Sequence, residues 1–247
     1  FQRKCIKMNM DIEYSIKKIN MNEGFSFSFA NMETVIVIIS GKYKVCFDEQ
    51  KDGISGERKS VFDSAAHVIY VPRECEARIQ AESHELVVVI ASTYAEKKLK
   101  PFVKSEGFKK EIRGKKEYKR TVIDLLNEDD DTESVFVGET FHTNGVWSGY
   151  PPHKHDVEIK GKESKNEELY FVKVEPSNGF GIFVKYTDKT HKDAFVVNDE
   201  TFIYVKEGYH AILSAPEYNF YYLWIASSMD KKFICASDDD FSWIEER

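Results

Sequence analysis

The sequence predicts an all-β protein built from two barrels in tandem, and three observations favour that fold class. Short strand-like segments are punctuated by turn residues along most of the chain, which is typical of sandwiches and barrels. Apolar segments recur when the chain is shifted by 134 residues, which indicates an internal repeat. The length of 247 residues exceeds one typical small domain, although all-β chains of this size also form one compact unit.

The first half contains a regular series of expected strands. Residues 1–24 are polar and have no strong period, whereas residues 25–29 alternate Phe with Ser, the pattern of a half-buried strand. Residues 34–39 form an apolar, β-branched run that ends at Ser40-Gly41, and residues 42–47 continue as a strand, so we expect a hairpin. A polar loop covers residues 48–60, and further strands are expected over residues 67–71, 77–81 and 86–91.

The middle of the chain is strongly charged. Residues 97–120 hold eleven Lys or Arg against three Glu, and residues 127–133 are acidic. A basic run with interleaved aromatics can bind nucleic acid, but the acidic segment would cancel its field, and the whole chain carries a net charge of −7. We therefore predict a solvated connector and no nucleic-acid partner. The expected division is a first barrel over residues 1–96, a charged connector over 97–133 and a second barrel over 134–247.

The second half contains a similar series of expected strands. Strands are expected over residues 171–174, 179–186, 195–197, 201–205 and 220–226. At the 134-residue offset, Leu86–Ile90 lies over Phe220–Trp224, and Glu33 falls within one residue of Glu168. His210 lies over Glu76, and the first half has no H-x-H motif before Glu33. Metal chemistry is therefore expected in the second barrel alone, with the first barrel as a packing or dimerisation partner, so a homo-oligomer is possible.

A histidine motif in the second half points to a metal. Residues two apart on a strand face the same side, so His153 and His155 would aim two imidazoles at one point. The preceding Pro151-Pro152 stiffens the approach and limits backbone donors. Glu168 and His210 follow in later strand-like segments. Three imidazoles and one carboxylate suit one divalent transition metal ion, although each histidine alone would more often be a surface or core residue.

Composition excludes several other classes. The cysteines Cys5, Cys46, Cys75 and Cys235 show no paired spacing, so neither a zinc ribbon nor a disulfide framework is expected. No apolar run approaches the roughly 20 residues of a membrane span. The amino terminus lacks the apolar segment of a signal peptide. We expect a cytoplasmic protein with no membrane partner.

A group of motifs across nearly the whole chain resembles the cupins and, more narrowly, the bacterial 5-deoxy-glucuronate isomerase (IolB) family. The residues that carry this resemblance are Gly138–Thr140, Trp147-Ser148, the run Tyr150–Asp156, Glu168, Gly179–Gly181, Tyr186–Asp188, Gly208–His210 and Tyr221–Leu223. The resemblance implies a bicupin fold, and it implies that His153, His155, Glu168 and His210 are the ligands of one divalent metal ion, Zn, Mn or Fe.

The resemblance also implies an activity, the metal-dependent isomerisation of 5-deoxy-glucuronate or a related uronic acid in inositol breakdown. A metal can acidify a C–H next to a carbonyl, and a nearby base then moves the proton. The candidates for that base are Glu139, Tyr170, Lys154 and Tyr222. The candidates for binding the sugar acid are Arg113, Arg120 and Lys185. Asp156 is either an acceptor that orients His155 or a solvated turn residue.

Three positions depart from the family pattern. Phe183-Val184 stand where the family has a Gln-Arg pair, Trp224 stands where it has Asn, and Ala211 follows Gly-Tyr-His where Pro is usual. These changes bear on the substrate more than on the metal. Two other functions stay open: a non-catalytic sugar-acid-binding cupin, favoured by the loss of the Gln-Arg pair, and an iron-dependent cupin dioxygenase.

Overall fold

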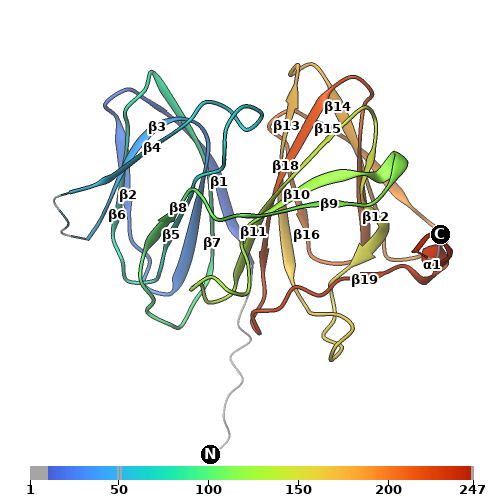
Figure 1. The fold of residues 1–247 in the computed structure, drawn as a ribbon. Coiled ribbons are helices and arrows are strands. Elements are labelled where there is room, and N and C mark those ends of the chain that lie inside the picture. Colours follow the sequence, from blue (N-terminus) through green and yellow to red (C-terminus); the bar gives the residue numbers. More distant parts are fainter. Residues whose placement is uncertain (1–10, 49, 51, 246–247) are drawn as a thin grey trace, which may run out of the picture.

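The chain folds into two β-sandwiches that stand side by side (Figure 1). The structure is a computed structural model that describes residues 11–48, 50 and 52–245. Within them, helix is limited to the short turns η1 (Lys116–Tyr118), η2 (Asp239–Phe241) and α1 (Ser242–Glu245). The predicted all-β architecture of two tandem barrels is confirmed.

The first sandwich shares one long strand between its two layers. Its strands are β1 (Glu13–Asn20), β2 (Gly24–Phe27), β3 (Met32–Phe47), β4 (Ile54–Arg58), β5 (Val68–Val71), β6 (Ala77–Ala81), β7 (Glu85–Tyr94) and β8 (Phe102–Lys104). One layer has the order β1-β7-β3-β5-β8; β4 and β6 pair with the far end of β3, and β2 pairs with β6. Strand β3 crosses between the layers at Gly41, which has a φ of +108°, and a Cβ there would lie 2.5 Å from the carbonyl oxygen of Glu85. Only glycine suits this crossing.

The second sandwich has two separate layers. Its strands are β9 (Lys109–Arg113), β10 (Arg120–Leu126), β11 (Val135–Thr143), β12 (Trp147–Lys154), β13 (Glu167–Glu175), β14 (Phe180–Tyr186), β15 (Asp193–Asn198), β16 (Phe202–Val205), β17 (Tyr209–Ser214), β18 (Asn219–Ser227) and β19 (Ala236–Ser237). One layer has the order β16-β13-β18-β11-β10-β9, and the other has the order β15-β14-β17-β12-β19.

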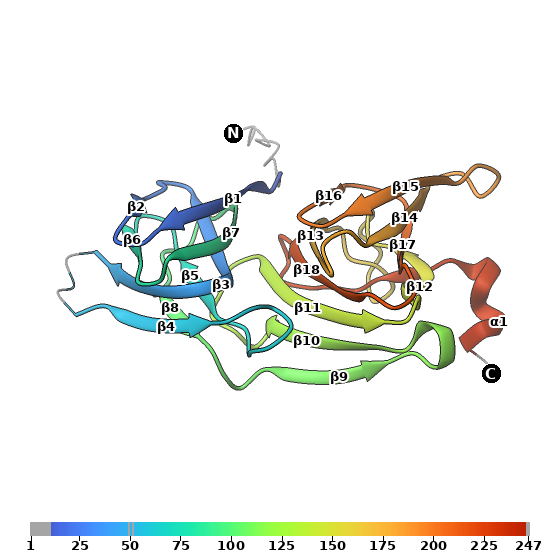
Figure 2. The ribbon, with the colours of Figure 1, turned by 90° about the horizontal axis from the view of Figure 1, so that it is seen from above.

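The charged middle segment differs from the expected solvated connector. Its first strand, β8, pairs with β5 of the first sandwich, and β9 and β10 extend the second sandwich beyond β11. Figure 2 shows β9 and β10 running alongside β11. The lysines of β9 remain exposed because β9 is an edge strand, so a charged sequence and a paired strand are compatible here.

Strand β3 explains why the first half contains an uninterrupted apolar run. Ile36 and Ile38 pack in the core of the first sandwich. Val35 and Val37 point the other way, into a core shared with residues of the second sandwich such as Leu223. A strand buried on both faces loses the alternation of apolar and polar residues. The two sandwiches therefore pack through their sheets, and the shared core fixes their relative position.

The internal repeat is visible in the strand register. Thr34 pairs with Val71 in the first sandwich, and Glu168 pairs with Val205 at the corresponding place in the second. The hydroxyls of Thr93 and Ser227, which are 134 residues apart, meet at 2.8 Å where the halves join. The 134-residue offset thus relates equivalent strands, and it places Thr34 where the second half has Glu168.

Two buried carboxylates tie the halves together. Glu33 is 1% exposed and accepts hydrogen bonds from the Ser134 amide at 2.7 Å and from the Tyr70 hydroxyl at 2.8 Å. Glu139 is also 1% exposed; its Oε1 and Oε2 accept from the guanidinium of Arg58 at 2.7 and 3.0 Å, and Tyr221 donates to Oε1 at 2.8 Å. Each carboxylate is fully paired, as burial requires.

We expect the Arg58–Glu139 pair to dominate the energetics of this interface. Arg58→Met leaves the Glu139 carboxylate buried with one hydroxyl donor, which should lower the free energy of unfolding by about 3–5 kcal/mol. Urea denaturation followed by tryptophan fluorescence measures the change. The double variant Arg58→Met/Glu139→Gln removes the unpaired buried charge and should recover most of the lost free energy of unfolding.

The matched control for this experiment is Lys42→Met, because Lys42 forms an exposed ion pair with Glu57 at 3.4 Å. That variant should change stability by less than about 1 kcal/mol. Equal effects of Arg58→Met and Lys42→Met would contradict the interface account.

Candidate metal centre and pocket

Three strands and one loop bring four metal-binding side chains together. On β12, His153 faces the interior of the second sandwich, and His155 follows just beyond the end of the strand on the same side. The register of β12 against β17 sets His153 directly opposite His210. This ladder shifts between Ser148 and His153, where Pro151 and Pro152 supply no amide donors. Glu168 enters from β13 in the facing layer.

The four side chains converge at one point. One ring nitrogen from each of His153, His155 and His210 lies within 4.8 Å of the other two. The Oε2 atom of Glu168 lies 3.0 Å from Nε2 of His155 and 3.4 Å from Nε2 of His210. His155, His210 and Glu168 are each at most 3% exposed. The sequence analysis predicted these four residues as ligands, and the fold gathers all of them.

Backbone carbonyls orient two of the imidazoles. Nδ1 of His155 lies 3.0 Å from the carbonyl oxygen of Asn166, and Nδ1 of His210 lies 3.0 Å from that of Gly208. Each Nδ1–H therefore donates to backbone and each Nε2 points to the centre, where that of His155 lies within hydrogen-bonding distance of Oε2 of Glu168. Asp156, considered above as an acceptor for His155, instead accepts from the amide of Gly208 at 2.7 Å.

This donor set fits a divalent transition metal. Nε2 of His210 is buried and has no hydrogen-bond partner among the described residues, a costly arrangement unless the atom binds something else. Burial lowers the pKa of His153 to about 3, and the neighbouring His210 and His155 add to that effect, so the ring is neutral. Burial acts against ionisation of Glu168, but the neighbouring imidazoles of His155 and His210 hold its pKa below the usual range. Three imidazole nitrogens and one carboxylate are suitable ligands for Zn, Mn or Fe.

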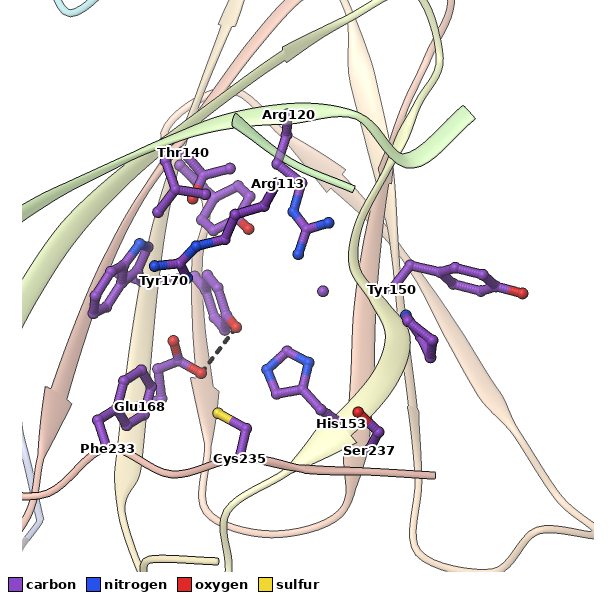
Figure 3. Close-up of a pocket in the computed structure, with 15 residues that line it drawn as sticks. Arg113, Arg120, Thr140, Tyr150, His153, Glu168, Tyr170, Phe233, Cys235 and Ser237 are labelled. Atoms are coloured by element: carbon purple, nitrogen blue, oxygen red, sulfur yellow. Dashed lines mark hydrogen bonds between the residues drawn. The ribbon is translucent and has the colours of Figure 1, made fainter. Parts of the chain in front are cut away.

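A pocket opens directly above the centre. Its volume is about 290 Å³, close to the lower end of the roughly 300–1,000 Å³ of small-molecule sites. Figure 3 shows Arg113 and Arg120 on one side of the pocket and Glu168, His153 and Cys235 on the other. The pocket is lined by Arg113, Arg120, Val122, Thr140, Gly149, Tyr150, Pro151, His153, Glu168, Tyr170, Tyr222, Trp224, Phe233, Cys235 and Ser237.

Two predicted tyrosines lie in this pocket. Tyr170 donates its hydroxyl hydrogen to Oε2 of Glu168 at 2.8 Å, as the dashed line in Figure 3 marks. The Tyr222 hydroxyl lies 2.5 Å from the hydroxyl of Ser148. Burial raises the pKa of both phenols, so both stay protonated at neutral pH. Tyr170 therefore supports a metal ligand, whereas Tyr222 can face a bound molecule.

Two arginines supply the positive charge of the pocket. Arg113 ends β9 and Arg120 begins β10, so the turn between these strands holds both at the pocket rim. Nε of Arg113 lies 3.0 Å from Oε2 of Glu111, and Nη2 of Arg113 lies 3.7 Å from Oδ1 of Asp124. Arg120 donates to the carbonyl oxygen of Tyr118 at 3.1 Å, and no carboxylate among the described residues pairs with it. The Arg120 guanidinium is thus available to an anionic ligand.

Three other predicted site residues lie outside the pocket. Glu139 faces the first sandwich, because neighbouring residues on β11 point to opposite faces and Thr140 takes the inward position. Lys154 points outward between His153 and His155 and binds Asp156 at 2.5 Å and Glu163 at 2.9 Å. Lys185 lies opposite His210 on β14 but does not line the pocket. The sequence analysis expected Glu139, Lys154 and Lys185 beside a substrate, but none of them lines this pocket.

The positions that depart from the family pattern lie close to the centre. Phe183 is buried and stacks against His210, with ring centroids 6.1 Å apart and an interplanar angle of 18°. Trp224 lines the pocket and stacks on Phe233. The sequence analysis did not find Tyr150, Phe233 or Cys235 as pocket residues. Tyr150 belonged to the recognised histidine motif, whereas nothing in the carboxyl-terminal segment indicated that it folds back over the pocket.

Two sandwiches in tandem, the second with a histidine cluster that could hold a metal ion, define the chain as a bicupin. Its fold matches oxalate decarboxylase OxdC of Bacillus subtilis with a TM-score of 0.65, at 10% identity over 96% of this chain and 75% of that one. The match is much closer to an IolB-like protein from Salmonella typhimurium LT2, with a TM-score of 0.89 and 26% identity over 95% of this chain and 90% of that one.

The chain belongs to the KduI/IolB family, whose model matches residues 5–244. The 5-deoxy-glucuronate isomerase of Bacillus licheniformis is 32% identical over 98% of this chain and 91% of its own length. That of Bacillus subtilis strain 168 is 31% identical over 97% and 90%. With such relatives along nearly its whole length, the chain is an enzyme of the isomerase class. None of its described helices is long and apolar enough to cross a membrane.

The metal centre can be tested without any substrate. The protein should bind one equivalent of a divalent transition metal, and His155→Ala or His210→Ala should weaken binding by more than the roughly 10–100-fold typical of losing an outer hydrogen-bonding partner. Calorimetric titration and elemental analysis of the dialysed protein measure this. His191→Ala is the matched control, because that side chain is 80% exposed. If both ligand variants still bound one full equivalent of metal, the assignment of His155 and His210 as ligands would be refuted.

Proposed function

We propose that this protein is a metal-dependent aldose–ketose isomerase that acts on 5-deoxy-glucuronate or a closely related uronic acid in inositol breakdown. The observation that carries the proposal is a metal-binding centre and an arginine rim at opposite sides of one pocket. A sugar acid has a carbonyl at one end and a carboxylate at the other. The pocket offers complementary groups to both ends. The names of the curated relatives support the same substrate.

The arginine rim sets the orientation of the substrate. Guanidinium groups bind carboxylates through charge-assisted hydrogen bonds, often two at a time. Arg120 has no carboxylate partner among the described residues, and Arg113 lies beside it at the rim. The carboxylate of a uronic acid bound there leaves the rest of its chain pointing to His153 and Glu168. The aldehyde and the neighbouring hydroxyl then reach the metal centre.

The metal ion, when bound, would polarise the carbonyl oxygen and so acidify the adjacent C–H. The residues around the centre hold the carboxylate ligand in place and can supply a proton to a substrate oxygen. Tyr170 donates to Oε2 of Glu168 and keeps that carboxylate in place. Tyr222, paired with Ser148, holds a proton beside the bound chain and can donate it to a substrate oxygen.

The substrate assignment predicts activity that depends on Arg120. Purified, metal-loaded protein should consume the aldehyde of 5-deoxy-glucuronate and produce a ketose with no other cofactor. Arg120→Met should raise KM by about one to two powers of ten, because a charge-assisted contact is worth roughly 1.5–3 kcal/mol, and should change kcat less. Lys185→Met, outside the pocket, is the matched control and should leave both constants unchanged. If a filled metal site gives no turnover on this or related uronates, the non-catalytic sugar-acid-binding function replaces the isomerase.

The two tyrosines should differ in what they affect. Tyr222→Phe removes a donor that faces the substrate, so kcat should fall by about 10²–10³ while metal affinity stays unchanged. Tyr170→Phe removes the donor to Glu168, so metal affinity should fall by roughly 10–100-fold. Steady-state kinetics and metal titration of the two variants separate these roles. A loss of metal by Tyr222→Phe and not by Tyr170→Phe would contradict the assignment.

A further inference from the structure

One wall of the pocket is apolar. Trp224 is 8% exposed and stacks on Phe233, with ring centroids 5.5 Å apart and an interplanar angle of 21°. Val122, on β10, is 4% exposed and lines the same pocket. Gly138 makes room for the indole, because a Cβ on that residue would lie 2.0 Å from Cζ2 of Trp224. The backbone of β11 thus fixes Trp224 as part of this wall.

The wall lies next to the arginine rim. Arg120 and Val122 are two residues apart on β10, so their side chains face the same way, and both line the pocket. Arg113 lies 3.7 Å from Asp124, and Asp124 is the cross-strand neighbour of Gly138, the residue beneath Trp224. A carboxylate held by the arginines therefore places the carbon attached to it against Val122 and Trp224.

The remainder of the pocket is polar by contrast. His153 and Glu168 form the floor, and the hydroxyls of Tyr170 and Tyr222 stand beside them. Hydroxyl groups near the carbonyl end of a sugar acid find partners there. A hydroxyl on the carbon next to the carboxylate would instead lie against indole, phenyl and isopropyl groups, with Thr140, the cross-strand neighbour of Val122, as the polar side chain beside them, and it would lose most of its hydration.

We propose that Val122, Trp224 and Phe233 select sugar acids that have a methylene, and no hydroxyl, on the carbon next to the carboxylate. The inference rests on the substrate orientation given under the proposed function, and it assigns to these three residues the preference for a deoxy acid. An apolar site rejects a ligand that adds one hydroxyl by up to about 10²-fold. We therefore expect a preference of roughly 10–100-fold.

The test compares binding of two open-chain acids. Borohydride reduction of 5-deoxy-glucuronate and of glucuronate removes both aldehydes, so neither product can form a pyranose ring and the two differ in one hydroxyl group. Calorimetric titration of the Mn²⁺-loaded protein gives the ratio of their dissociation constants. This ratio should be about 10–100 in favour of the deoxy acid. It requires no turnover, so it is independent of the isomerase assay.

Variants connect that ratio to the wall. Trp224→Asn supplies an amide to the extra hydroxyl and should lower the ratio by about tenfold, whereas Trp224→Phe keeps the wall apolar and should preserve it. Val122→Thr adds a hydroxyl with almost no change in size, and it provides the same test if Trp224→Asn does not fold. Arg120→Met should weaken both acids equally and leave the ratio unchanged.

The outcomes separate the two proposals. A wild-type ratio near one, a ratio unchanged by both Val122→Thr and Trp224→Asn, or no binding of either acid would overturn the role of the wall. Discrimination in binding together with no turnover of 5-deoxy-glucuronate would support the selective role of the wall and would contradict the proposed isomerase activity.

Discussion

The register between β12 and β17 is the constraint on which the site depends, because it sets His153 opposite His210. A slip of one residue would turn every side chain of β12 to the other face and separate the imidazoles. The register is supported at both ends. Ser148 pairs with Ile212 inside the sandwich, and both are buried. Beyond His155, the Asp156 carboxylate accepts a hydrogen bond from the backbone amide of Gly208, the residue just before β17.

The two sandwiches share an architecture but contribute differently to the site. Equivalent strands pair in equivalent registers, yet Thr34 stands where the second half has Glu168 and bonds Ser92 at 2.8 Å. Among the described residues, the histidine cluster of the second sandwich is the one group able to hold a metal. The first sandwich contributes its sheet face to the shared core and Arg58 to a buried carboxylate on β11. It thereby fixes the strand that carries Thr140 at the pocket wall.

Strands with a clear apolar pattern could be predicted from the sequence, and charged ones could not. The run over residues 34–39 predicted part of β3, whereas β1 and β9 were missed because edge strands can carry lysines on their exposed positions. Strand β10, which pairs between β11 and β9, was missed as well. The metal ligands were predictable because strand alternation is local. The position of Glu139 was not, because it depends on Arg58, 81 residues away in the chain.

Proton transfer on the substrate is the central claim, and isotope incorporation tests it most directly. Metal-loaded protein would be incubated with 5-deoxy-glucuronate in D₂O, and the ketose product examined by proton NMR and mass spectrometry. Removal of the C–H proton and reprotonation at the neighbouring carbon predict a product with deuterium at the former aldehyde carbon, absent with His155→Ala. A ketose formed without any deuterium would mean that the hydrogen passes between the two carbons without exchange with solvent, as in hydride transfer, and would contradict the account.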